Sequence, residues 1–245
     1  MPSATSRSTR LLPDGTPLQN RLLAALPAAD YQRILKHLRL KTVATGETLQ
    51  EPGTHITDVH FPNGGVFSIT NRMRDGALVE VATVGREGML GIGVFLGDRT
   101  GAGRTFQQVM NGTLPTLTAG QFLTEAAPPG PFHDVVGHYA QAVLLQIMQC
   151  TACNALHDVR QRCARWLLQT HDRVGADDFL LKQESLAVML GVRRPTVTLV
   201  LRELQDAGAI STRYGHIRIL KRKRLEAASC ECYGVIRNHF RRLGL

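Results

Sequence analysis

The sequence predicts an α+β protein with an N-terminal double-stranded β-helix (jelly roll), a long central helix and a C-terminal winged helix-turn-helix. Short β-type runs separated by glycine-containing turns fill residues 40–121. An unbroken helical pattern follows over 132–157, and residues 183–206 have the spacing of two helices joined by a tight turn. With 245 residues the chain is long enough for two domains of this kind.

Residues 1–17 are rich in Ser, Thr, Arg and Pro and lack an apolar stretch, so we expect a disordered tail and not a secretory signal. No apolar run approaches the roughly 18 residues of a membrane-spanning helix. The five cysteines are an odd number without disulfide-framework spacing, which is typical of a reducing compartment. We therefore expect a cytoplasmic protein with no membrane partner.

The jelly roll is predicted over 18–131, with a proline-rich loop at its end. Two short helices divided by Pro27 open it, and its clearest strands are 59–61, 66–70 and 78–84. Many short strands at this spacing are typical of a sandwich, barrel or jelly roll. We interpret this part as a sensor domain.

The central helix, 132–157, is predicted to form a dimer. Apolar and small residues recur at alternating steps of four and three, as in a coiled-coil seam: Val136, Ala140, Val143, Ile147, Cys150 and Asn154. A second apolar face is available for the roll: Val135, Leu144, Leu145 and Met148. We expect the first face to meet a second copy of the chain; the alternative is a helix packed only on its own roll.

The most specific motif lies in the last predicted domain, 158–245. Counted from Gln183, small or branched residues occupy positions 5, 9, 15 and 18: Ala187, Gly191, Val197 and Val200. Close approach of two helices requires the small side chain, the tight turn requires glycine, and the branched residues face inward. This spacing predicts a DNA-reading helix-turn-helix; the alternative is an ordinary helical hairpin.

The second helix of the motif begins with Arg193-Arg194-Pro195-Thr196, and proline fits its first turn. Arg194 and Thr196 are the predicted base-reading residues, because arginine suits bidentate bonding to guanine. A β-hairpin wing is predicted over 209–220. Contacts with the DNA backbone are expected from the second helix and the wing: Arg193, Thr198, Arg202, Arg213, Tyr214 and Arg218.

The charge is uneven along the chain. Residues 176–245 carry 13 Lys/Arg and 7 Asp/Glu, whereas the rest carries 16 and 13. A small basic unit on a nearly balanced body is typical of a nucleic-acid reader. Within it, the basic run 221–224 either reaches flanking phosphates or is a solvated surface segment.

Three segments together resemble the Crp/Fnr superfamily of bacterial transcription regulators, and the resemblance spans nearly the whole chain. They are Thr45-Gly46-Glu47-Thr48-Leu49, Gly85-Arg86-Glu87-Gly88-Met89 and Leu190-Gly191-Val192-Arg193-Arg194-Pro195-Thr196-Val197-Thr198. The resemblance implies a homodimer with a swivelling DNA-binding domain, a pseudo-palindromic operator and RNA polymerase as a partner. It also implies that Arg194 makes the principal guanine contact. Family members often carry glutamate where this chain has Pro195, so a different base preference is expected.

The resemblance also suggests a ligand pocket in the roll, formed by Glu87, Gly91, Arg104 and Thr105. A cyclic-nucleotide cassette needs a glutamate for the ribose and an Arg-Ser/Thr pair for the phosphate. Arg104-Thr105 could supply the pair, but Gly91 stands where the glutamate belongs, and Glu87 lies 17 residues before Arg104. The roll is therefore expected to hold another small-molecule or nucleotide effector or to act as a scaffold; a cyclic-nucleotide regulator with a divergent pocket is the alternative. No cofactor is predicted.

The cysteines begin at Cys150, so the N-terminal iron–sulfur cluster of some family members is not expected. We interpret Cys150, Cys153 and Cys163 as small buried residues and predict no metal. A metal or cluster bound by the thiolates of Cys150, Cys153, Cys230 and Cys232 is an alternative, although the two pairs belong to different predicted domains. A thiol redox switch is another alternative. No catalytic grouping occurs, so an enzyme is not predicted; the rival from that class is a cupin-like metal enzyme using histidines of the roll.

Overall fold

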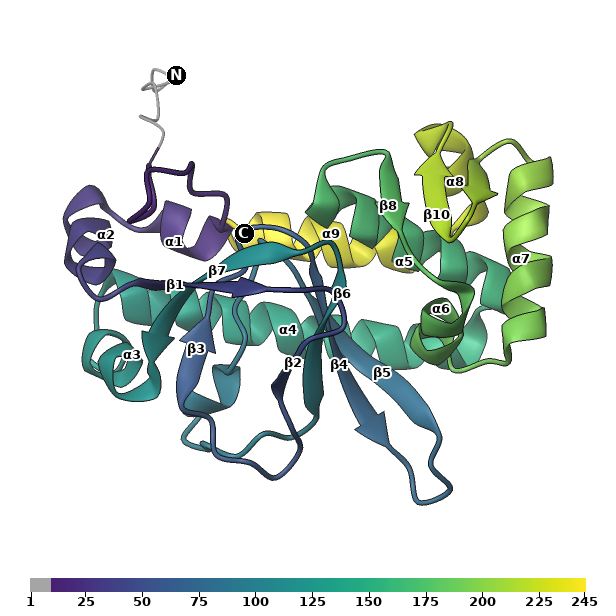
Figure 1. Ribbon diagram of the computed structural model, residues 1–245. Helices are drawn as coiled ribbons and strands as arrows, with labels where there is room; N and C mark the ends of the chain where they lie inside the picture. Colours follow the sequence, from purple (N-terminus) through teal and green to yellow (C-terminus); the bar gives the residue numbers. More distant parts are fainter. Residues whose placement is uncertain (1–9) are drawn as a thin grey trace.

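The computed structural model describes residues 10–245 (Figure 1). The helices are α1 (Arg21–Ala25), α2 (Ala28–Leu35), the 3-10 turn η1 (Ile92–Val94), α3 (Ala119–Ala126), α4 (Pro131–Leu156), α5 (Val159–Val174), α6 (Gln183–Leu190), α7 (Arg194–Asp206), α8 (Arg222–Ala228) and α9 (Cys232–Arg242). The strands are β1 (Arg39–Val43), β2 (Thr48–Gln50), β3 (Asp58–His60), β4 (Val66–Arg72), β5 (Leu78–Val84), β6 (Arg104–Val109), β7 (Gly112–Thr118), β8 (Asp178–Leu180), β9 (Ile210–Arg213) and β10 (His216–Ile219). Within this part of the chain, every helix is too short or too polar to cross a bilayer.

The roll consists of two antiparallel sheets, with strand orders β1-β7-β3 and β2-β6-β4-β5. A small cluster of buried side chains lies within the roll: Val43, Phe67, Val84, Leu90 and Leu114. The runs predicted at 66–70 and 78–84 are β4 and β5, which pair with Phe67 opposite Val84. The predicted α+β fold, a β roll followed by a long helix and a helix-turn-helix, is confirmed.

The segment before α1 differs from the expected disordered tail. Part of that prediction concerns residues 1–9, which lie outside the described residues. Arg10 donates hydrogen bonds to the carbonyl oxygens of Leu23 (2.9 Å) and Ala24 (3.1 Å) at the end of α1. Leu12 is buried, and Leu11 pairs with Pro17. Residues 10–17 therefore fold onto the roll, because one arginine satisfies helix-end carbonyls and one leucine enters the core.

Helix α4 corresponds to the predicted central helix, but its two apolar faces are used differently from our expectation. Val136 is buried in the core of its own chain, and Val143 and Cys150 pack against that core. Leu144 and Met148, which we assigned to the roll, are each 59% exposed. The N-terminal part of the predicted seam is thus covered by the chain's own helices, whereas Ile147 of the same seam is 38% exposed beside Leu144 and Met148. The dimer seam itself stays a prediction.

The C-terminal domain has a continuous core built from α5, α6, α7 and the small sheet β8-β10-β9. Helix α5 begins with a capping box in which Asp158 and Gln161 bond reciprocally, and it ends at Gly175 in the left-handed conformation (φ 71°). Both signals are local, so they fix the length of the helix independently of its packing.

The last helix, α9, has no counterpart among the elements predicted from the sequence. It packs beside α4 (Figure 1), and Ile236, Phe240 and Leu245 enter the same core as the roll's first helices. The predicted DNA-binding domain, 158–245, includes these residues. In the structure, the chain leaves the helix-turn-helix after α8 and returns to the central helix.

The two domains meet at a partly buried polar contact. Glu80 on β5 accepts hydrogen bonds from the Ser68 hydroxyl (2.6 Å) and from the indole N–H of Trp166 on α5 (2.8 Å). Nearby, Arg173 on α5 forms a buried ion pair with Glu87 of the roll (2.8 Å). These contacts hold the DNA-binding domain against its own roll in this conformation.

Candidate nucleic-acid interface

The turn between α6 and α7 has the geometry that the sequence pattern required. Gly191 adopts a left-handed conformation (φ 63°), and the following residue, Val192, donates to the Ala187 carbonyl (3.0 Å). Ala187, Val197 and Val200 are buried between the helices. The predicted helix-turn-helix is confirmed, because the glycine lies in the tight turn and the small and branched residues are buried between the two helices.

Helix α7 exposes a polar stripe near its start. Arg194, Thr198 and Arg202 are spaced by four residues, lie on one face and are all exposed. The N-cap is Arg193, and neither it nor Lys182 before α6 makes a side-chain cap bond. The first N–H groups of both helices are thus without a side-chain acceptor, and a phosphate suits the start of such a helix.

Arg194 is held by a neighbour within the motif. Its Nε forms an ion pair with Oε1 of Glu184 on α6 (3.1 Å), and both side chains are well exposed. An exposed pair of this kind contributes about 0–1 kcal/mol, so a guanine edge can replace the carboxylate at little cost.

Two residues of α7 depart from the sequence-based expectation. Thr196, predicted to read bases, is half-buried, whereas Thr198, predicted to touch the backbone, shares the exposed stripe with Arg194. Leu199, which sequence reasoning did not single out, is 63% exposed on the outer side of the helix. The sequence alone could have identified it. A leucine outside the inward-facing positions of a recognition helix is free to contact a thymine methyl group.

The wing is the β9–β10 hairpin, and Tyr214 stands at its tip. Tyr214 is 88% exposed and has a positive φ of 50°, and the guanidinium of Arg213 lies 5.2 Å from its ring centroid. Arg218 is engaged with Asp178 on β8 (3.0 Å). Hydrogen bonds from His216 and Arg218 hold the pKa of Asp178 below its usual value.

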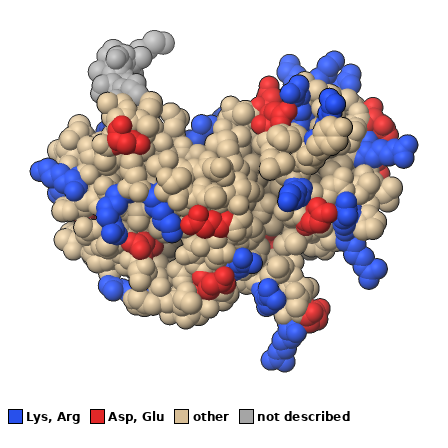
Figure 2. Space-filling view, in the orientation of Figure 1, with Lys and Arg blue, Asp and Glu red and all other residues tan. Residues whose placement is uncertain are grey.

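A surface hollow of about 270 Å³ connects helix α7 with the wing. It lies between the start of α6, the start of α7 and the wing, and Arg194, Arg213 and Tyr214 line it. Figure 2 shows Lys and Arg side chains gathered over the part of the molecule that holds α7, α8 and the wing. The structure thus brings the predicted base-reading arginine and the predicted wing contacts to one basic surface.

The basic run after the wing serves more than one role. Arg222 forms ion pairs with Asp172 (2.8 Å) and Glu226 (3.0 Å) and is therefore part of the fold. Arg224 donates to the Ala207 carbonyl at the end of α7 (2.9 Å). Lys221 and Lys223 are exposed and are the members of the run that can reach flanking phosphates.

Comparison with known proteins agrees with this geometry. Residues 161–228 match the family described as the Crp-like helix-turn-helix domain. The chain carries a Crp-like helix-turn-helix domain on the Crp/Fnr fold. That fold is shared with a transcriptional regulator of the Crp/Fnr family from Eubacterium rectale (TM-score 0.65, 19% identity, covering 86% of this chain and 98% of that one). No curated protein sequence matches the chain.

Two further structures with the Crp/Fnr fold are similar. FixK2 from Bradyrhizobium japonicum has a TM-score of 0.68 at 14% identity, covering 79% of this chain and 98% of its own. The regulator CLP from Xanthomonas campestris, described as c-di-GMP responsive, has a TM-score of 0.64 at 19% identity, covering 80% and 100%. At these identities the likeness establishes the fold.

The residues expected to form a ligand pocket in the Crp/Fnr roll lie in separate surroundings. Arg104 donates to the Thr48 hydroxyl (2.7 Å) and pairs with Glu51 (3.5 Å), whereas Glu87 is buried against Arg173 of α5. Thr105 is buried within its sheet, and Gly91 has a left-handed conformation (φ 89°) beside β3. Glu87 and Arg104 thus belong to two different networks.

A larger cavity lies elsewhere, between the roll, α5 and α9, with a volume of about 650 Å³. Arginines dominate its lining: Arg21, Arg86, Arg173, Arg222, Arg237 and Arg241. Arg173 and Arg222 are paired with carboxylates, whereas no ion pair among residues 10–245 involves Arg21 or Arg241. Its charge suits an anionic small molecule.

Proposed function

We propose that the protein is a DNA-binding transcription regulator of the Crp/Fnr type that binds a pseudo-palindromic operator as a homodimer in the cytoplasm. The observation that carries this proposal is the exposed stripe of α7, which lies beside a basic wing in a Crp-like helix-turn-helix domain. Arg194 is the proposed guanine reader, with Thr196 at the same helix end. RNA polymerase is the partner proposed for an activating role.

The proposed backbone contacts come from this helix and from the wing. Thr198 and Arg202 belong to the exposed stripe and Arg193 is the N-cap before it, whereas Arg213, Tyr214 and Arg218 belong to the wing. Because Arg218 is already paired with Asp178, its share of the phosphate contact is the smallest of the set. Pro195 at the second position of α7 supports a base preference of its own for this chain.

The homodimer is proposed to form through α4. Leu144, Ile147 and Met148 form an exposed apolar stripe on this helix, and exposed stripes of this kind mark protein interfaces. A two-fold axis along α4 places one recognition helix in each of two half-sites about 34 Å apart, one turn of DNA.

The effector is proposed to be an anionic small molecule held in the arginine-rich cavity between roll, α5 and α9. This site touches both domains, so a bound anion would bias their relative position. CLP is described as responsive to c-di-GMP, an anionic dinucleotide, and shares the fold. A thermal-shift screen of cyclic mono- and dinucleotides, with Arg21→Ala as the cavity variant, tests this part.

A catalytic role is not part of the proposal. Among residues 10–245, no group of metal-ligating side chains of the cupin type lies in the roll. His60, a candidate there, is buried against Thr116 (2.8 Å), and burial lowers its pKa to about 4. Neither the metal enzyme nor the cyclic-nucleotide cassette is favoured over the regulator.

The decisive test is selection of binding sites from random duplex DNA by the full-length protein. We expect wild type to enrich a pseudo-palindrome, Arg194→Ala to lose preference at one base pair of each half-site, and Arg99→Ala, an exposed arginine of the roll, to behave as wild type. Absence of any enrichment by wild type would contradict the proposed function. Equal selectivity of Arg194→Ala would overturn only the assignment of the base reader.

A further inference from the structure

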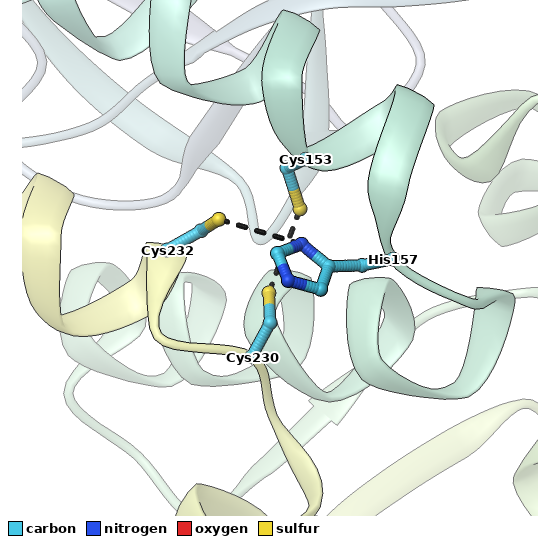
Figure 3. A group of neighbouring side chains, drawn as sticks. All are labelled: Cys153, His157, Cys230 and Cys232. Carbon is cyan, nitrogen blue, oxygen red and sulfur yellow. Dashed lines mark hydrogen bonds between the residues drawn. The ribbon is translucent and has the colours of Figure 1, made fainter.

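Four potential metal ligands converge where the end of α4 meets the start of α9 (Figure 3). Cys153 lies in the last turn of α4 and His157 caps it, while Cys230 and Cys232 flank the start of α9. Their ligand atoms all lie within 4.8 Å of one another. The two cysteine pairs belong to different predicted domains, and the return of α9 to the central helix brings them together.

We propose that Cys153, His157, Cys230 and Cys232 bind a structural zinc ion. Tetrahedral zinc with Zn–S bonds of about 2.3 Å and Zn–N bonds of about 2.0–2.1 Å separates two sulfurs by about 3.8 Å and a sulfur from a nitrogen by about 3.6 Å. Cys153 Sγ lies 3.5 Å from Cys230 Sγ, and Cys232 Sγ lies 3.6 Å from Nδ1 of His157. These are two edges of such a tetrahedron.

The burial of the thiols differs from that of a cysteine that only fills space. Cys153, Cys230 and Cys232 are buried against one another in a cluster of their own, separate from the large cores. Cys163, in contrast, is buried among the aliphatic residues of the C-terminal core. A polar cluster that buries three sulfurs beside an imidazole has the composition of a closed Cys3His zinc site.

The surrounding residues orient the ligands. Nε2 of His157 lies 3.2 Å from a carboxylate oxygen of Glu231, which leaves Nδ1 to face the sulfurs. A carboxylate behind a metal-binding histidine fixes its tautomer and raises its basicity. The amide nitrogen of Gln149 donates to Cys232 Sγ (3.0 Å), as expected beside a thiolate.

A buried cation beside the cluster supplies an independent argument. Arg165 on α5 is buried, and its guanidinium donates to Gln169 (2.9 Å) and approaches Cys150 Sγ (3.5 Å). Its Nε has no hydrogen-bond partner, and none of the described carboxylates forms an ion pair with it. A buried charge needs a compensating one. Glu80 faces Arg165 only from farther away, whereas three thiolates around a divalent ion carry one net negative charge close to it, which Arg165 would balance.

A single zinc ion fits these four ligands better than an iron–sulfur cluster does. Three sulfurs and one nitrogen select zinc or an iron–sulfur cluster, and ligand atoms this close together suit a single ion. All four positions of the tetrahedron are filled by protein, so the role is structural and not catalytic. All four ligands lie outside the matched residues 161–228, with Cys153 and His157 before them and Cys230 and Cys232 after them.

The test uses the full-length protein. We expect one zinc ion per chain by elemental analysis after purification without added chelator. Replacement of zinc by Co²⁺ is expected to give the visible ligand-field bands and sulfur-to-cobalt charge transfer of a tetrahedral thiolate site. Cys232→Ser should abolish these bands. Glu231→Gln, which keeps all four ligands, should weaken metal affinity about tenfold. Cys163→Ala is the matched control and should bind as wild type.

Several results would overturn the proposal: wild type without stoichiometric metal or cobalt–thiolate bands, an iron–sulfur spectrum, or equal losses in Cys163→Ala and Cys232→Ser. Circular dichroism and gel filtration accompany each variant. If Cys232→Ser does not fold, the affinity of folded Glu231→Gln decides the question, since unchanged affinity contradicts the orientation of His157. None of these readouts depends on DNA binding, so they stand apart from the proposed regulatory function.

Discussion

Glu80 is a half-buried carboxyl group that connects the two domains. It lies on β5 with Ser68 of β4 on one side and Trp166 of α5 on the other, and Arg165 and Arg173 of α5 face it from farther away. Burial raises its pKa to about 7, although the two hydrogen bonds and the arginines lower it in part. At neutral pH the group is therefore poised between its neutral and ionised forms.

The first prediction concerns Glu80→Gln. A raised carboxyl pKa means that the folded state favours the proton. Wild type should therefore lose stability as pH rises from about 4.5 to about 7, by about 2–3 kcal/mol. Glutamine can accept from the Trp166 indole with its oxygen and donate to the Ser68 hydroxyl with its NH2 group, and it has no charge to bury. The free energy of unfolding of the variant should match wild type at pH 5 and exceed it at pH 8.

Trp166, the one tryptophan of the sequence, offers a direct readout of the same group. Its fluorescence should titrate near pH 7 in wild type and stay flat in Glu80→Gln. A titration that persists in the variant would assign it to another group.

The second prediction separates a phosphate contact from a base contact on α7. Arg202→Ala should weaken binding about equally for all DNA sequences and reduce the slope of log K against log salt by about 0.9, because one fewer counterion is released. Arg194→Ala should cost about 1–3 kcal/mol on the preferred site and little on random DNA. Salt titrations of both variants on specific and random duplexes provide the comparison. A sequence-dependent loss for Arg202→Ala would show that it also reads bases.

The residues of the helix-turn-helix could be predicted because each depends on neighbours within about twenty positions. Gly191 must turn the chain and Ala187 must admit the second helix, so their identities are visible in the sequence itself. The partners of Glu87 and Cys153 lie 86 and 77 residues away. No local pattern encodes contacts at that separation, so the engagement of Glu87 by Arg173 and the cysteine cluster were missed.

At the scale of elements, α4 shows what sequence periodicity can predict about a helix and what it cannot. Its length was evident from the sequence, but two apolar faces competed for the core. Which face is buried depends on α1, α3 and α9, which pack on the side of α4 that holds Val136 and leave Leu144 exposed to solvent. Helix α9 itself was not predicted, although it packs Ile236 and Phe240 against the N-terminal core. A sequence pattern indicates that a face is apolar, but the neighbouring elements decide what covers it.

The third prediction tests the exposed face of α4. Leu144→Asp places a charge in the centre of the proposed dimer seam and should give a monomer by light scattering. Operator affinity should fall because the two half-sites are no longer bound together. Leu96→Asp changes another exposed leucine, on the roll, and should stay dimeric. A dimer that survives Leu144→Asp would place the interface elsewhere.

At the scale of the whole molecule, the junction between α4 and α5 is held from two sides. On one side, Glu80 and Glu87 bind the DNA-binding domain to the roll through Trp166 and Arg173. On the other, α9 returns to the end of α4 beside the proposed zinc ligands. The zinc site would therefore fix the end of the central helix, from which the DNA-binding domain departs.

The fourth prediction follows from that position. Removing zinc with a chelator should expose α9 and the last turn of α4 to exchange with solvent while β4 and β5 stay protected. Where free zinc had exceeded its dissociation constant a hundredfold, local opening should become about a hundredfold more frequent, or about 2.7 kcal/mol easier. Hydrogen exchange measured by mass spectrometry resolves these segments separately. The same chelator applied to Cys232→Ser should change nothing. Because the metal acts on one end of the helix, a uniform rise across the roll would indicate global unfolding and contradict a clamp at the junction.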